Sequence, residues 1–313
     1  MSELRLGPGP EFDRIRAIAA ALGDRASGLG GDVAYLEVGG RHLALSTDLS
    51  VEGVHFRRDW LGFEEIGWRA ASAALSDLAA AGAQPIGVLA ALTVPAREGT
   101  GTFTALMDGV AAAAGAVHGV VLGGDLSRGG AIALAITVAG IAERKLERRG
   151  ARPGDGVWVT GELGGAGAAL AAWTAGRPPD PAARARFARP EPRIAAGAWL
   201  AAHGATAMMD LSDGLAGDAE HLAAASAVHL HIGLERLPVH PAVPAEARAA
   251  GEPPQLFAAR AGEDYELLVA LPPGFPGGAG FPLARIGEVE DGRGVRFELD
   301  GRAHALAGFD HFA

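Results

Sequence analysis

The 313-residue chain contains no cysteine and only one lysine, Lys145. Without cysteine there is no disulfide, no thiolate ligand for a metal ion and no cysteine nucleophile. A P-loop needs a lysine directly after a glycine, and Lys145 follows Arg144. The sequence therefore excludes P-loop nucleotide-binding proteins and enzymes that depend on cysteine.

Positive charge is also scarce, because 27 basic residues stand against 37 acidic ones, for a net charge of −10. Binding of nucleic acid by counterion release needs a basic surface, so we expect no nucleic-acid partner. The long uncharged run at 78–96 is interrupted by glycine, glutamine and proline at 82–87, which argues against a membrane span. The start of the chain has no basic stretch followed by an apolar one. We expect a soluble, cytoplasmic protein with no membrane partner.

Small and apolar residues are abundant, since hydrophobic residues make up 49% of the chain and glycine contributes 47 residues. This composition can supply sizeable cores, and the length suggests about two domains. A charged segment rich in turn residues at 144–155 is a plausible boundary. We predict an N-terminal domain of residues 1–148 and a C-terminal domain of residues 149–313.

Both halves mix strands and helices without the strict alternation of a doubly wound sheet, which predicts α+β or mixed α/β domains. Helices are predicted at 11–23, 64–81, 102–116 and 212–225, one follows the glycine loop at 161–167, and another ends at 203. Strands are predicted at 33–38, 42–47, 86–94, 120–122, 131–142, 156–160, 207–210, 229–234 and 265–271. Residues 283–303 are predicted to form a hairpin with its turn at Asp291-Gly292.

Four aspartates, Asp32, Asp48, Asp125 and Asp210, stand at predicted strand ends beside glycine, serine or threonine. Loop oxygens converge at such places, and binding sites gather there. Taken singly, each aspartate is explained at least as well by ordinary turn chemistry, because turns favour aspartate, glycine and serine. Their number makes a shared site a hypothesis worth testing.

Asp77 stands out because it shares the small, apolar face of the helix predicted at 64–81 with Ala73, Ala74 and Ala81. A carboxylate on such a face is costly unless it is paired or bound to a metal ion. A structural partner such as an arginine and a metal ion both remain possible on this position alone.

Together with Ser46 and Thr47, these aspartates form a donor set made only of oxygen atoms. Mg²⁺ prefers oxygen ligands, whereas zinc would need histidines, and no H-x-x-x-H pair is present. An Mg²⁺ site rich in aspartate usually serves phosphates, since the metal bridges the acidic protein and a polyanionic nucleotide.

Five motifs, in this order, resemble the thiamine-monophosphate kinase family, which is part of the wider aminoimidazole-ribonucleotide-synthetase-like superfamily. They are STDLSVEGVHF at 46–56, LSDLAAAGA at 75–83, GGDLSRG at 123–129, DLSDGL at 210–215 and GEDYELL at 262–268. The resemblance extends from about residue 12 to the terminal GFDHF at 308–312. It implies ATP-dependent phosphorylation of thiamine monophosphate to thiamine diphosphate. It also implies an N-terminal domain that binds ATP and metal and forms a homodimer through its sheet, beside a C-terminal α/β domain.

The same resemblance implies roles for individual residues, with Asp48, Asp77 and Asp210 expected to be catalytic. His55, Glu263 and Phe309 would contact thiamine monophosphate. ATP would contact Gly124, Asp125, Arg149 and Ser212. Mg²⁺ would be held by Asp32, Ser46, Thr47, Asp48, Asp77, Asp125, Asp210 and Asp213.

The chain departs from the family pattern at three places in the expected site. One is the third motif, which reads Asp-Leu-Ser-Arg at 125–128 where Asp-Thr-Thr-Arg is commoner. Val33 stands where the family usually has the second aspartate of a Gly-Asp-Asp loop, so one expected metal ligand is missing and Asp32 is the residue that could compensate. Phe309 keeps an aromatic face but lacks the polar tip of the tryptophan or tyrosine that the family usually carries there.

Other functions are weighed against the same residues. Another ATP-using enzyme of the superfamily, such as aminoimidazole ribonucleotide synthetase, is the nearest alternative. Selenophosphate synthetase typically needs a cysteine or selenocysteine, which this chain lacks. A catalytically impaired nucleotide- or metal-binding module would explain Val33. A purely structural protein would leave the five motifs and Asp77 without an explanation.

Overall fold

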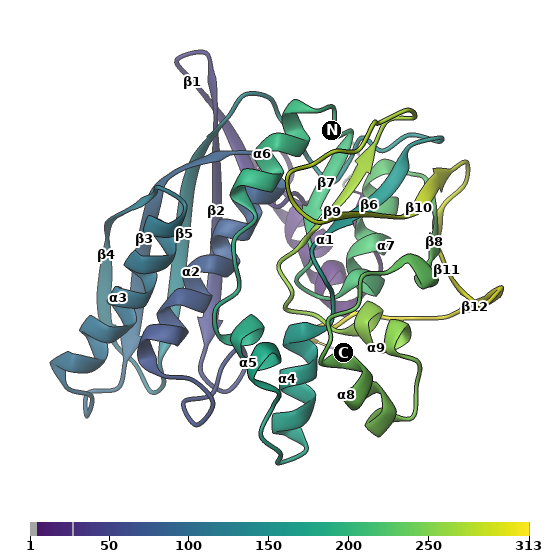
Figure 1. Cartoon of the computed structure of the whole chain (residues 1–313). Helices are drawn as coiled ribbons and strands as arrows, with labels where there is room; N and C mark the ends of the chain where they lie inside the picture. Colours follow the sequence, from purple (N-terminus) through teal and green to yellow (C-terminus); the bar gives the residue numbers. More distant parts are fainter. Residues whose placement is uncertain (1–4, 27, 313) are drawn as a thin grey trace.

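The computed structural model describes residues 5–26 and 28–312, and it contains two β-sheets that follow one another along the chain (Figure 1). The first sheet has five strands in the order β1-β2-β5-β3-β4. These are β1 (Ala34–Val38), β2 (Arg41–Val51), β3 (Gln84–Val94), β4 (Val120–Arg128) and β5 (Ala133–Ala142). The second sheet has seven strands in the order β12-β11-β8-β10-β6-β9-β7. These are β6 (Gly156–Thr160), β7 (Ala207–Asp210), β8 (His229–Gly233), β9 (Leu267–Leu271), β10 (Leu283–Glu290), β11 (Gly294–Leu299) and β12 (Arg302–His304).

Helices pack around both sheets. They are α1 (Pro10–Leu22), α2 (Phe63–Ala80), α3 (Thr100–Ala116), α4 (Gly165–Thr174), α5 (Pro181–Ala188), α6 (Ile194–Ala202), α7 (Leu215–Ser226), α8 (Val243–Ala250) and α9 (Pro254–Arg260). Among the helices of the described residues, none combines the length and the apolar character needed to span a bilayer.

Helices α2 and α3 cover one face of the first sheet and lie close to each other (Figure 1). Their contact depends on two glycines, because a Cβ at Gly67 would lie 1.9 Å from the carbonyl oxygen of Leu106, and one at Gly109 would lie 1.9 Å from that of Glu64. Helices α5 and α6 of the C-terminal half also pack against α2. Helix α2 is therefore buried over most of its surface, and 13 of its 18 residues are buried.

The opposite face of the first sheet carries large apolar side chains that no other part of the described chain covers. Strand β5 shows the difference between the two faces. Its residues 134, 136, 138, 140 and 142 are buried, whereas the residues between them are only partly buried. Leu36, Leu49, Leu89, Val120 and Leu122 are all more than 40% exposed on this side. We call this surface the open face of the first sheet.

The predicted mixed α/β fold with two sheet domains is confirmed, and the hairpin of β1 and β2 is found where it was predicted. Its turn, Gly39-Gly40, has positive φ at both residues, 59° and 75°, which suits a two-residue hairpin. The strand predicted at 120–122 extends to Arg128, and the helix predicted from 212 begins at Leu215. Helices α5, α8 and α9 were not predicted. The boundary between residues 148 and 149 stays a prediction.

The predicted hairpin at 283–303 is wrong. Strands β10 and β11 do form on either side of Asp291-Gly292, but β8 lies between them. It pairs with β10 in antiparallel fashion and with β11 in parallel fashion. The true hairpin joins β11 and β12. The turn sequence predicts a reversal of the chain correctly, but it cannot reveal that a strand from residues 229–233 enters the gap.

A buried carboxylate ties α5 and the start of α6 to the second sheet. Glu266, with no exposed surface, accepts hydrogen bonds from Arg186 at 2.7 Å, from Arg193 at 2.6 and 2.8 Å, and from Thr160 at 2.7 Å. Burial alone would raise the pKa of Glu266, but the hydrogen bonds and charges of the two arginines outweigh it and lower the pKa. Both carboxylate oxygens are thus satisfied by charged or hydroxyl donors.

We expect Glu266→Ala to lower the free energy of unfolding by about 3–5 kcal/mol, because it leaves two partly buried arginines without their counterion. Denaturant titration followed by circular dichroism measures this loss. Glu288→Ala is the control, since that glutamate lies 3.7 Å from Arg285 on an exposed part of the same sheet and should change stability by less than about 1 kcal/mol. Equal effects of the two substitutions would contradict the role given to Glu266.

Candidate active site

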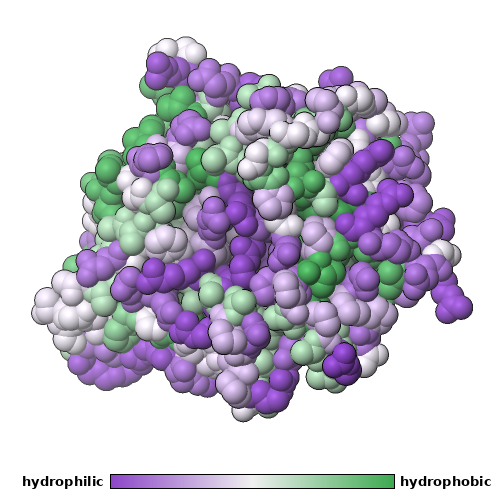
Figure 2. All heavy atoms as spheres, viewed as in Figure 1, coloured by the Kyte–Doolittle hydropathy of each residue, from purple (hydrophilic) through white to green (hydrophobic). Residues whose placement is uncertain are grey.

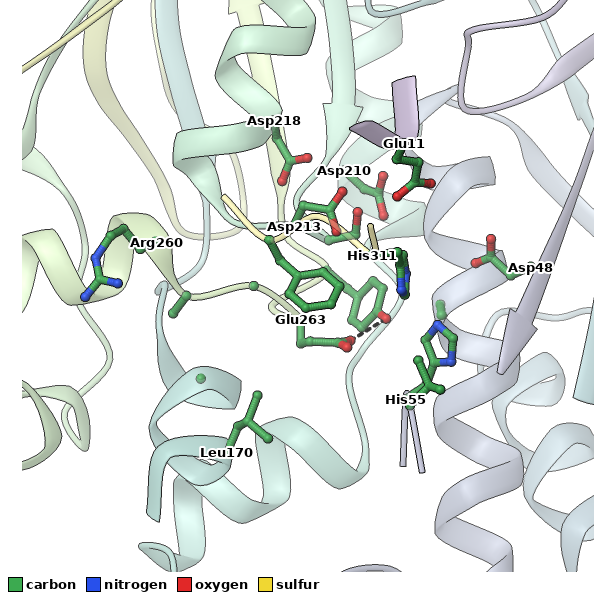
Figure 3. Close-up of a pocket in the computed structure, with 18 of the residues that line it drawn as sticks. Glu11, Asp48, His55, Leu170, Asp210, Asp213, Asp218, Arg260, Glu263 and His311 are labelled. Atoms are coloured by element: carbon green, nitrogen blue, oxygen red, sulfur yellow. Dashed lines mark hydrogen bonds between the residues drawn. The ribbon is translucent and has the colours of Figure 1, made fainter. Parts of the chain in front are cut away.

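A cavity of about 730 Å³ lies between the two halves of the chain. Its walls come from β2 and α2 on one side and from β7, α4, the start of α7 and the loop before β9 on the other, with α1 and residues 309–311 beside them. Hydrophilic residues gather in the middle of the molecular surface, between the two sheets (Figure 2). Asp48 and His55 face Asp210, Asp213 and Glu263 across the cavity (Figure 3).

Three carboxylates converge in this cavity. Asp32 lies on the segment before β1, Asp77 lies on α2 and Asp210 is the last residue of β7, so the entry to the first sheet, its covering helix and the second sheet each supply one. One oxygen of each lies within 4.8 Å of the others. Ser46, on β2, donates a hydrogen bond to Asp77 at 2.5 Å. We call these three aspartates the carboxylate cluster.

Burial and mutual repulsion raise the pKa values of the carboxylates in and beside the cluster. Burial raises the pKa of Asp77 well above its usual range, and the negative charges of Asp48, Asp210 and Asp32 add to the effect. Burial, with the charge of Asp32, raises the pKa of Asp210 to about 8. Burial, together with Glu263 and Asp32, also raises the pKa of Asp48 to about 6. The site therefore favours a positive charge that would stabilise these carboxylates in their ionised form.

One positive charge of the chain already reaches the cluster, because Arg148 donates a hydrogen bond to Asp32. The predicted ATP contact, Arg149, lies outside the cavity instead, where it is exposed and pairs with Glu147. Val33 is 7% exposed and belongs to the core. Asp32, the residue expected to compensate for the missing second acid, is the one that joins the cluster.

The residues predicted to contact thiamine monophosphate also line the cavity. His55 accepts a hydrogen bond on Nδ1 from the backbone of Val51 at 3.1 Å, and burial lowers its pKa. Its ring centre lies 5.1 Å from that of His311. The side chain of Phe309 is 58% exposed, and its backbone N–H donates to the carbonyl oxygen of Asp213 at 2.9 Å. Its aromatic face is accessible at the cavity.

Ser46, Thr47, Gly124 and Asp125 are not among the residues that line the cavity, and Ser46 reaches it only through its hydrogen bond to Asp77. The register of the strands places Asp125 in one row with Leu49, whereas Asp48 stands in the neighbouring row. Because side chains alternate along a strand, Asp125 projects from the open face and Asp48 from the opposite one. Strands β2 and β4 are also three strand spacings apart, or roughly 14 Å. Within one chain, Asp125 is therefore remote from the carboxylate cluster.

Several cavity residues were not predicted, among them Glu11, Arg69, Asp218, His221 and His311. Asp218 is only 2% exposed, and its Oδ2 has no hydrogen-bond partner within the described part of the chain. A signal for it exists in the sequence, since Asp218 lies three residues after Leu215 and four before Leu222 on the apolar face of α7. This is the pattern that singled out Asp77.

Comparisons with known proteins agree with this arrangement. Residues 30–142 match the family described as AIR synthase related protein, N-terminal domain, and residues 152–300 match AIR synthase related protein, C-terminal domain. The two sheets and the cavity between them thus define an AIR synthase related protein. Within that class, the chain belongs to the thiamine-monophosphate kinase family.

Individual relatives support this placement. The thiamine-monophosphate kinase of Aquifex aeolicus (strain VF5) is 34% identical over 99% of this chain and 100% of its own length. The thiamine-monophosphate kinase of Halobacterium salinarum is 36% identical over 95% of this chain and 99% of its own. A solved structure described as AaThiL complexed with AMPPCP and TMP covers 100% of this chain and 98% of its own, at 34% identity and a TM-score of 0.89.

We expect Asp77→Asn to raise the melting temperature of the metal-free protein at pH 8, because it removes an ionisable group from a crowded, buried place. The folded chain retains the proton of Asp77 above about pH 3.9, where the unfolded chain releases it. The loss of folding stability caused by Asp77 is therefore absent below that pH. It increases by at most about 1.4 kcal/mol per pH unit as the pH rises.

Thermal unfolding in EDTA between pH 5 and pH 8 tests this. The control is Asp108→Asn, which changes an exposed aspartate of α3. The advantage of Asp77→Asn should shrink steadily as the pH falls. A wild-type protein that is the more stable of the two at pH 8 would contradict the electrostatic account.

Proposed function

We propose that this chain transfers the γ-phosphoryl group of ATP to thiamine monophosphate, giving thiamine diphosphate and ADP. The observation that carries the proposal is the carboxylate cluster, which lies in one cavity with the predicted substrate contacts His55, Glu263 and Phe309. Its relatives bear the name thiamine-monophosphate kinase, and the similar solved structure holds AMPPCP and TMP. We also propose that the chain acts in the cytoplasm, where ATP is available.

The residues of the cavity fit Mg²⁺. The cluster offers oxygen atoms only, three carboxylates are close enough to share a cation, and Asp218 has a buried oxygen without a partner in the described chain. Asp32, Ser46, Asp48, Asp77, Asp210 and Asp213 are the residues that would hold it. When bound, Mg²⁺ neutralises phosphate charge.

The reaction needs no nucleophile from the protein. A terminal phosphate oxygen of thiamine monophosphate attacks the γ-phosphorus of ATP in line, and the bond to the oxygen of the β-phosphate breaks as the new one forms. The work of the chain is to position the two phosphates and to exclude water. Ser212 would contact ATP, His55 and Glu263 would orient the acceptor, and Phe309 would stack on the thiamine.

We expect the purified protein to form ADP and thiamine diphosphate only when ATP, Mg²⁺ and thiamine monophosphate are all present. Asp210→Asn should lower kcat by a factor on the order of 10²–10³, because charge stabilisation in the transition state depends on the cluster. Asp291→Asn, in the exposed turn after β10, is the control and should leave kcat unchanged.

Chromatographic analysis of the products decides between the alternatives. Turnover of formylglycinamidine ribonucleotide without turnover of thiamine monophosphate would assign the chain to the synthetase branch instead. Binding of ATP with neither turnover would indicate an impaired nucleotide-binding module.

We also propose that a second copy of this chain covers the open face, forming a homodimer through the two first sheets. Apolar side chains of four strands lie exposed there, and hydrophobic residues gather at the upper left of the molecule, over this sheet (Figure 2). Thr47 and Asp125, two predicted ligands that lie outside the cavity, project from the same face. The homodimer would therefore place both at an interface, beside a second chain.

Leu89→Glu should convert the dimer to a monomer, because it introduces a charge at the centre of the open face, where Leu89 is 44% exposed. Light scattering coupled to size-exclusion chromatography measures the mass of the protein in solution. Ile18→Glu, which places the same charge on an exposed position of α1, should leave the dimer intact. A wild-type protein that is monomeric at micromolar concentration would refute the proposal.

A further inference from the structure

Arg69 is a buried arginine of α2 whose side chain reaches the C-terminal half, and only 3% of it is exposed. Its Nη1 donates to the carbonyl oxygen of Phe187 at 2.6 Å, and its guanidinium carbon lies 3.8 Å from the centre of the Phe187 ring. Its Nη2 donates to Oε2 of Glu263. A guanidinium presents its donors in a rigid, planar fork, so these three contacts hold it in one orientation.

The carboxylate of Glu263 receives a second donor at the same oxygen, because the hydroxyl of Tyr265 donates to Oε2 at 2.6 Å (Figure 3). Within the described chain no protein donor reaches the other oxygen, Oε1. The side chain of Glu263 lines the cavity. Arg69 and Tyr265 therefore occupy one oxygen of this carboxylate and leave the other for a ligand.

The backbone around Glu263 is held in a conformation that its residues do not prefer. Glu263 and Tyr265 have φ values of 72° and 53°, in the left-handed region that residues with a Cβ rarely adopt. Their backbone N–H groups donate to the carbonyl oxygens of Ser212 at 2.7 Å and Leu211 at 2.9 Å. Such strain persists only where surrounding contacts enforce it, and Arg69 supplies one of these contacts from the other half of the chain.

Helix α2 connects this carboxylate to the carboxylate cluster. Arg69, Ala73 and Asp77 are spaced by four residues, so they lie along one stripe of the helix, and all three line the cavity. The stripe spans about 12 Å from Arg69 to Asp77, at 1.5 Å per residue. One rigid element thus holds a predicted metal ligand at one end and the partner of a predicted substrate contact at the other.

We propose that Arg69 is a positioning residue for thiamine monophosphate. With Tyr265 it fixes the carboxylate of Glu263 so that Oε1 faces the substrate, where it accepts a hydrogen bond from the amino group of the thiamine or stabilises its positive charge. Arg69 itself does not touch the reacting phosphates. The inference rests on the proposed function, because it takes thiamine monophosphate as the ligand that Glu263 contacts.

Steady-state kinetics with each substrate varied separately tests the proposal. Arg69→Met should raise KM for thiamine monophosphate by about 10- to 100-fold, the loss typical of a charge-assisted hydrogen bond. It should change KM for ATP by less than about twofold. Arg69→Lys should recover part of the loss, because it restores the charge and one donor. Tyr265→Phe, which removes one hydroxyl and nearly preserves the shape, should raise the same KM by a smaller factor.

Two further variants make the result specific. Adding Arg69→Met to Glu263→Gln should cause little further loss, since the two residues act as one unit. Arg184→Met is the matched control, because Arg184 also joins the C-terminal half to α2, through Glu65 at 2.8 Å, but does not line the cavity. It should leave KM for thiamine monophosphate unchanged.

The outcomes separate this inference from the function on which it rests. If Glu263→Gln leaves KM for thiamine monophosphate unchanged, the substrate contact assigned to Glu263 is wrong, and the inference is overturned with it. If Glu263→Gln raises that KM but Arg69→Met and Tyr265→Phe do not, only the positioning role is overturned. Equal changes in both KM values, or strictly additive losses in the double variant, would give Arg69 a merely structural role.

Discussion

The enclosure of α2 is the constraint on which the rest of the site depends. The first sheet lies on one side of this helix, α3 on another, and α5 and α6 of the C-terminal half on the remaining sides. Half of its residues are glycine, alanine or serine, and a charged side chain on it can reach a polar environment in few directions. The side chains of Arg69 and Asp77 both extend toward the cavity. The polar character of the site is thus a consequence of how completely the helix is buried elsewhere.

Enclosure also explains why the carboxylates remain together although they repel one another. Each carboxylate lies on an element whose position is fixed by other contacts. Asp77 lies on the buried helix, Asp210 at the end of a fully buried strand and Asp32 just before the first hairpin. Packing holds the backbones in place, so the side chains cannot separate. Such repulsion between side chains persists only where the surrounding packing enforces it, and it is typical of sites that bind a charged ligand.

The sequence predicted those parts of the fold and site that depend on neighbours along the chain. Asp77 was found because helical spacing placed it among alanines, and the β1–β2 hairpin because Gly39-Gly40 is a strong local turn signal. What it could not predict depends on contacts distant in sequence. Of the adjacent arginines 148 and 149, only tertiary structure decides that the first enters the cavity. The insertion of β8 between β10 and β11, and the position of Asp125 on the open face, are set by strand order in the same way.

The packing of α5 and α6 on α2 has a consequence for how the protein is made. Residues 1–148 contain the whole first sheet, yet a chain that ends there lacks the segment 181–202 that covers α2. It would also lack the partners of Trp68, Arg69 and Glu65, which contact Pro190, Phe187 and Arg184. During synthesis the first sheet can form before this segment emerges from the ribosome, but its helical layer is complete only afterwards. The two halves have separate sheets, but they share the helical layer around α2.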